Sequence, residues 1–146
     1  MAKSYRALLP LSLTMFGLGV AAGWGTHLGV AHAQAMNRVF ELRTYTANPG
    51  RLERLVQRFG DDTIGLFEKH GMTNIGYFTA MDAPASENTL IYLLAHKDRA
   101  AAEASWAAFR ADPDWRRISE ETQRDGPMVD NIVSVFLTPT SFSQIK

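Results

Sequence analysis

The 146-residue chain contains no cysteine. It therefore offers no disulfide, no thiol nucleophile, no thiolate ligand for a metal and no cysteine for a lipoprotein anchor. Its charges show no excess of either sign, because 15 Lys and Arg residues balance 15 Asp and Glu residues. Without a basic or acidic bias there is no electrostatic reason to expect nucleic acid or an anionic lipid surface as a partner.

Several common functional motifs are also missing. The chain has no G-x-x-x-x-G-K-[ST] loop, no G-x-G-x-x-G strand turn and no G-x-S-x-G elbow, which argues against the usual nucleotide-binding and serine-hydrolase classes. It has no H-x-x-H or H-E-x-x-H spacing either, so a zinc site of three or four ligands would need carboxylates. We therefore expect neither a metal nor a cofactor.

The first 35 residues have the layout of an export signal. Lys3 and Arg6 precede an uncharged run over residues 7–35, and this run ends in two overlapping A-x-A sequences of the kind that signal peptidases cleave. We expect cleavage after Ala33 or Ala35, and hence a periplasmic or secreted protein.

The alternative for this segment is an uncleaved membrane anchor, because the run is long enough to span a bilayer, which takes ~20 residues. The A-x-A sequences and the helix-weakening glycines in the run favour cleavage. A membrane contact is expected only for the anchored form. After cleavage, 13 basic residues would remain against 15 acidic ones, a net charge of −2.

Residues 36–146 read as one domain of alternating strands and helices. Period-two patterns rich in β-branched and aromatic residues predict strands at 38–46, 72–81, 89–96 and 128–137. Helical spacing of apolar residues predicts helices at 51–70, 98–110 and 113–124, the first irregular near Gly60. The resulting β-α-β-β-α-β order predicts an α+β, ferredoxin-like fold with both helices on one face of a four-stranded sheet. A second copy is expected to cover the other face, which carries apolar residues too.

Two stretches of this domain resemble the NIPSNAP family. They are Phe40–Tyr45 followed by Pro49-Gly50, and Ser105–Arg110 followed by Asp112–Trp115, and the likeness extends from Val39 to about Leu137. The resemblance implies a homodimer of the dimeric α/β barrel type. Proteins of that type include monooxygenases, dehydratases and haem-binding members, whereas NIPSNAP proteins largely lack an established reaction, so fold analogy alone names no chemistry.

What the resemblance implies about function is accordingly general. It indicates an exported small-molecule-binding or interaction module, with a cofactor-free barrel enzyme acting on a small hydrophobic or carbonyl-bearing substrate as the alternative. Haem ligation by a histidine stays open by analogy with barrel relatives. Whether the protein is an enzyme is undecided at this point.

Candidate site residues lie on the first predicted strand. Glu41, Arg43 and Tyr45 share one face, while Phe40 and Leu42 lie on the other. We expect the apolar set to meet the helices and the polar set to point into the interior between two sheets, where an acid, a cation and a phenol could orient a polar ligand. The alternative is a buried Glu41–Arg43 pair that sets strand register or the dimer interface.

The third strand adds Tyr92 and His96, which share a face that we also assign to the barrel interior. His96 would then lie at the mouth of the cavity, where a histidine can carry protons near neutral pH. Its alternative is a strand-end histidine bonded to a loop carbonyl. The complete candidate ligand-binding set is Glu41, Arg43, Tyr45, Tyr92 and His96.

On the fourth strand, Asp130, Ile132, Ser134 and Phe136 lie on one face. We expect this face to point away from the helices, because the alternate set that begins at Val129 is more apolar.

We expect structural roles for three other conspicuous side chains. His70 ends the first long helix, where a cation interacts favourably with the helix dipole. Trp106 and Phe109 have the helical spacing of residues that pack on a sheet.

Overall fold

A computed structural model of the protein describes residues 38–146, so the expected signal and its cleavage sites lie outside the described residues. The strands are β1 (Val39–Ala47), β2 (Thr73–Thr79), β3 (Thr89–His96) and β4 (Val129–Leu137). They form a single sheet in the order β2-β3-β1-β4, and every neighbouring pair is antiparallel. This confirms the four predicted strands and an α+β fold compatible with the ferredoxin-like order.

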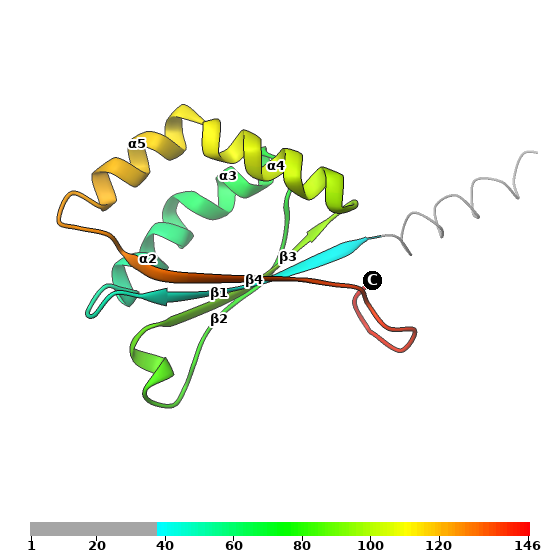
Figure 1. The fold of residues 1–146 in the computed structure, drawn as a ribbon, viewed down its shortest axis with the longest axis horizontal. Helices are drawn as coiled ribbons and strands as arrows, with labels where there is room; N and C mark the ends of the chain where they lie inside the picture. Colours follow the sequence, from blue (N-terminus) through cyan, green and yellow to red (C-terminus); the bar gives the residue numbers. More distant parts are fainter. Residues whose placement is uncertain (1–37) are drawn as a thin grey trace, which may run out of the picture.

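The helices are α2 (Leu52–Arg58), α3 (Ile64–Lys69), α4 (Arg99–Ala111) and α5 (Pro113–Thr122), and all lie on one side of the sheet (Figure 1). A π-helical turn, Phe59–Thr63, joins α2 to α3 and contains Gly60, where the irregularity was expected. Such turns insert an extra residue into a helix and are frequent at functional sites.

Gly71, with a φ of +77°, ends the long helix. Within residues 38–146, no helix is both long and apolar enough to cross a membrane.

The break between α4 and α5 follows from two adjacent residues. Asp112 caps α5 by accepting a 2.8 Å bond from the backbone nitrogen of Asp114, and Pro113 occupies the first helical position. The other Asp112 oxygen lies 2.9 Å from Lys69 Nζ and 2.6 Å from His70 Nε2. Hydrogen bonds from Lys69 and then His70 hold the pKa of the Asp112 carboxyl well below its usual range. His70 therefore ties the end of α3 to the start of α5, beyond its expected role at the helix dipole.

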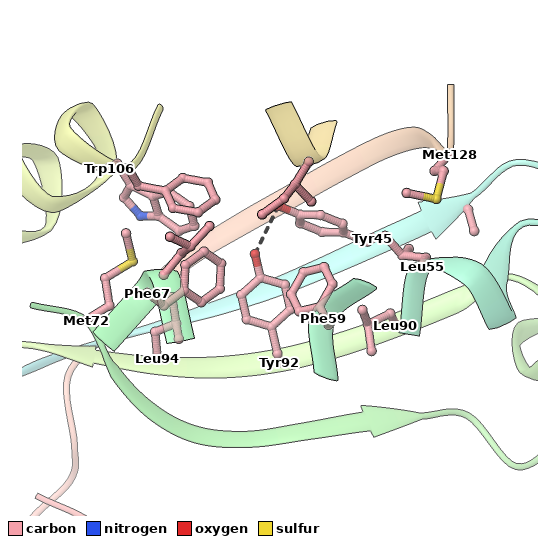
Figure 2. Close-up of a cluster of buried hydrophobic side chains, with 14 residues drawn as sticks. Tyr45, Leu55, Phe59, Phe67, Met72, Leu90, Tyr92, Leu94, Trp106 and Met128 are labelled. Carbon is pink, nitrogen blue, oxygen red and sulfur yellow. Dashed lines mark hydrogen bonds between the residues drawn. The ribbon is translucent and has the colours of Figure 1, made fainter. Parts of the chain in front are cut away.

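The hydrophobic core lies between the sheet and the helices and is rich in aromatic rings (Figure 2). Tyr92 of β3 is completely buried, with its ring 5.1 Å from that of Phe59 and 5.5 Å from that of Tyr77. Phe67 packs edge-on against Trp106 of α4 at 5.3 Å. Trp106 is thus a packing residue, as its spacing predicted.

The predicted orientation of β1 was wrong. Tyr45 belongs to the core beneath the helices, and Glu41 bonds to Trp106 of α4, so the face with Glu41, Arg43 and Tyr45 meets the helices. Leu42 lies on the opposite face. Period-two alternation sorts side chains into two sets, but it does not say which set the helices cover when both sets contain apolar atoms.

The same reversal holds for β4 and for the face assigned on β3. Ser134 lies directly opposite Arg43 and Ile132 directly opposite Tyr45 in the antiparallel pair, so both side chains share the helix-covered face. Tyr92 pairs with Arg43 from the other side and also lies under the helices. None of these residues therefore points into a space between two sheets.

The open face of the sheet carries the alternate residues. Phe78 is 59% exposed, Val133 49% and Val135 45%, although all three are large and apolar. At one end of this face the segment after β4 forms a loop (Figure 1), and residues 138–140, 143 and 145 line an apolar groove with Phe40, Leu93 and Leu137. The remaining apolar surface faces solvent within the described chain.

Candidate functional site

The five candidate residues from the sequence come together in one buried cluster. Antiparallel pairing of β1 with β3 places Arg43 opposite Tyr92 and brings His96 beside the start of β1. Arg43 Nη1 donates to Glu41 Oε1 at 2.8 Å, and Arg43 Nη2 lies 3.5 Å from the Tyr45 hydroxyl. The Tyr92 hydroxyl donates to that of Tyr45 at 3.0 Å (Figure 2). The five side chains thus lie together, on the opposite side of the sheet from the one expected.

Glu41 is the centre of this cluster and is 1% exposed. Its carboxylate accepts from Arg43 at 2.8 Å, from Ser134 Oγ at 2.7 Å, from Trp106 Nε1 at 2.7 Å and from His96 Nε2 at 3.1 Å. Burial by itself would raise the pKa of Glu41, but the four hydrogen bonds outweigh it and lower the pKa to about 2. Glu41 is therefore ionised at neutral pH, with its acceptor positions filled.

These contacts make Glu41 a hub that joins β1 to β3, β4 and α4. His96 is 2% exposed and donates to this carboxylate, so it is neither bonded to a loop carbonyl nor open to a cavity. Its Nδ1 is buried and has no hydrogen-bond partner among the described residues. Within residues 38–146, no group of three or more acidic or histidine side chains is placed to hold a metal ion.

A cavity of about 420 Å³ opens beside this cluster, between the helices and the strands β1 and β4, of which β4 is at the edge of the sheet. Four aromatic side chains supply much of its wall: Phe59, Phe67, Phe109 and Trp115. Its polar lining includes Tyr45, Arg58, Thr63 and Gln123, with the exposed Asp130 also at its border. The π-helical turn contributes Phe59 and Thr63, so the irregularity in the first long helix is part of the cavity wall.

Of the five candidates, only Tyr45 lines the cavity. Tyr45 therefore connects the two parts of the site, with the Glu41 hub behind it and the cavity in front. The hydroxyl of Tyr45 accepts from Tyr92 and from Arg43, so neither of these contacts uses its own proton.

Arg58 is the residue that the sequence reasoning missed. It is the last residue of α2, is 6% exposed and lines the cavity. A signal was present, because Arg58 stands three residues after Leu55 and one before Phe59, on the apolar stripe of the predicted helix. A charged residue on a buried stripe is unfavourable unless an ion-pair or hydrogen-bond partner, or a ligand, compensates its charge.

These features define the class of the protein: an α+β domain whose antiparallel sheet is covered by helices on one face, with an aromatic-walled cavity beneath them. The chain belongs to the NIPSNAP family, whose sequence model matches residues 40–144. This confirms the resemblance seen in the first strand and the second helix.

Solved structures of the same family are similar in fold. An uncharacterized NIPSNAP-like domain protein from Burkholderia xenovorans is 23% identical, with a TM-score of 0.65 over 74% of this chain and 90% of that one. A NIPSNAP family protein with unknown function from Agrobacterium tumefaciens is 22% identical, with a TM-score of 0.66 over 76% and 96% of the two chains. A comparison with curated proteins finds no match.

Proposed function

We propose that this protein is an exported, homodimeric NIPSNAP protein that binds a small organic molecule in the cavity between its helices and its sheet. The observation that carries the proposal is a buried cation, Arg58, in the wall of an aromatic cavity of about 420 Å³. Ligand sites are commonly 300–1,000 Å³, mostly apolar, with a few polar groups that fix the ligand's orientation. The cavity has this size and this mixture.

The state of Glu41 favours a binding protein over an enzyme that uses Glu41 for proton transfer. Its carboxylate is ionised, buried and bonded to four donors, and it does not line the cavity. A group in that state holds the protein together around the site and has no free position for a substrate proton. The hub therefore positions Tyr45 through Arg43.

A second copy of the chain is the proposed cover for the open face of the sheet. Exposed Phe78, Val133 and Val135 belong to a surface that extends across several strands. Contiguous apolar surface of this kind usually marks an interaction site. A symmetric dimer through this face would bury the same residues of both copies and give the barrel type expected from the sequence.

A cofactor-free enzyme remains the second candidate, and the Tyr45 hydroxyl is the observation that favours it. Tyr45 lines the cavity, and its proton is free because its oxygen accepts from Tyr92 and Arg43. In this form of the hypothesis Tyr45, rather than Glu41 or His96, would donate a proton to a carbonyl oxygen of the substrate. Tyr45→Phe should then abolish turnover of a molecule recovered from the cavity while leaving its binding within a fewfold.

Native mass spectrometry of the protein isolated from its own host tests the binding proposal. We expect a copurifying small molecule with the wild type and its loss in Gln123→Trp, which places a large ring in the cavity. Gln57→Trp is the matched control, because Gln57 is exposed on α2 and does not line the cavity. An empty wild type that also binds no aromatic compound in titrations would overturn the proposal.

A further inference from the structure

Arg58 is a buried cation without a buried anion. Its Nη1 donates to Thr122 Oγ1 at 3.3 Å, and its guanidinium lies 5.1 Å from the centre of the Trp115 ring. Its Nε is buried and has no partner, and among residues 38–146 no carboxylate lies within ion-pair distance of it. Most of the five N–H donors of this side chain are thus unused.

Arg43 differs from Arg58 in having a carboxylate partner. Arg43 is also largely buried, but it pairs with Glu41 at 2.8 Å and stacks 4.2 Å from the Trp106 ring. Burial lowers the pKa of Arg58, and the negative charge of Asp62 opposes this only in part. A buried charge is normally compensated, and leaving one uncompensated is destabilising. An arginine stays protonated in proteins, so an anion bound in the cavity would compensate the charge of Arg58.

The surroundings of Arg58 narrow the chemistry of that anion. A guanidinium presents two parallel donors that match the two oxygens of a carboxylate. The rings of Phe59, Phe109 and Trp115 line the same cavity and suit a flat apolar body. Tyr45 lines the same cavity, and its contacts with Tyr92 and Arg43 leave its own hydroxyl proton unused. The carboxylate of Asp130 is exposed at the cavity border, so the buried part of the site remains cationic.

We propose that the ligand is a small aromatic carboxylate whose carboxylate pairs with Arg58 and whose ring lies against Trp115 and Phe109. This inference rests on the proposed function, since it names the chemical class of the molecule that the cavity binds. It assigns to Arg58 the compensating charge that residues 38–146 do not supply.

Isothermal titration calorimetry of the full chain with two matched probes tests the inference. The probes are 2-naphthoate and 2-naphthamide, which share a ring system and differ in charge. We expect the wild type to bind the naphthoate at least tenfold more tightly than the naphthamide. Arg58→Met should remove this preference, and Arg58→Lys should retain part of it, because lysine keeps the charge without the planar pair of donors.

Arg54→Met is the control, because Arg54 lies on the same helix but pairs with Asp125 at the surface and does not line the cavity. It should keep the full preference for the carboxylate, and thermal melts should show that all three variants are folded. Equal binding of the two probes by the wild type, or an unchanged preference in Arg58→Met, would overturn the carboxylate assignment while leaving the binding proposal in place. Failure of the wild type to bind either probe would overturn the aromatic carboxylate, and the binding proposal itself would fall only if native mass spectrometry also found the wild type empty.

Discussion

Trp106 Nε1 lies 2.7 Å from Glu41 Oε2, and this bond joins α4 to β1, an inner strand of the sheet. It explains why a charged residue lies under the helices, where an apolar side chain was expected. The indole of Trp106 needs an acceptor when buried, and the ionised Glu41 satisfies it together with three other donors.

The Glu41 hub should dominate the stability of the sheet. Arg43→Met breaks a buried ion pair and should lower the free energy of unfolding by roughly 3 kcal/mol, the low end of the range for such pairs, because three donors still hold Glu41. Glu41→Met should lower it further, since it leaves the donors of Arg43, Trp106 and Ser134 unpaired. For the same reason the double variant should not regain wild-type stability, as urea unfolding would show.

The exposed pair of Arg117 and Glu121 provides the comparison for these variants. Its two side chains lie 3.1 Å apart on the surface of α5, where ion pairs contribute little. Arg117→Met should therefore unfold almost like the wild type. Full recovery of stability in the Glu41→Met, Arg43→Met double variant would show that the hub is replaceable by apolar packing.

Acid should weaken the protein through Glu41. The pKa of this carboxyl is about 2 in the folded protein against 4.5 for the free side chain, so the unfolded chain binds the proton more readily at acid pH. The contribution of Glu41 is complete above pH 4.5 and is lost as the pH falls toward 2, a loss on the order of 3 kcal/mol from the two pKa values.

Urea unfolding at pH 6 and at pH 3 measures this effect. The wild type should lose more stability over this interval than Glu41→Gln, which has no carboxyl to protonate. Glu121→Gln, at the exposed surface pair, should retain the wild-type pH dependence. An equal loss in wild type and Glu41→Gln would contradict a lowered pKa at this position.

The open face should hold two copies of the chain together. Val133→Lys combined with Val135→Lys places charges on the apolar surface and should convert a dimer into a monomer at micromolar concentration, because burying unpaired charges in an interface is unfavourable. Light scattering after size exclusion gives the mass. Val56→Lys changes a valine of similar exposure on the helical side and should remain dimeric. A monomeric wild type would eliminate the barrel arrangement.

Export predicts a defined start for the mature protein. N-terminal sequencing of the protein from the extracytoplasmic fraction should begin at Gln34 or Met36, the residues that follow the two A-x-A sequences. Recovery of the chain with Met1 intact from the membrane fraction would instead establish the anchored form.

Local signals in the sequence determined the elements of this fold. Strand alternation, the helical stripe that begins at Leu52, the Asp112-Pro113 restart and the stop at Gly71 depend on neighbours a few residues away, and the structure has all of them where the pattern indicated. The grouping of Glu41 with Arg43 and Tyr45 follows from the same local rule, because alternate residues of a strand share a face.

Only the tertiary structure decided which face of the sheet the helices cover and which residues line the cavity. The side of the sheet depends on long-range contacts such as Trp106 with Glu41, which are 65 residues apart, and period-two alternation is identical for either choice. The cavity likewise needs Arg58 of α2 and Trp115 of α5 in one wall. Their proximity arises from the packing of helices across the sheet, which no local pattern encodes.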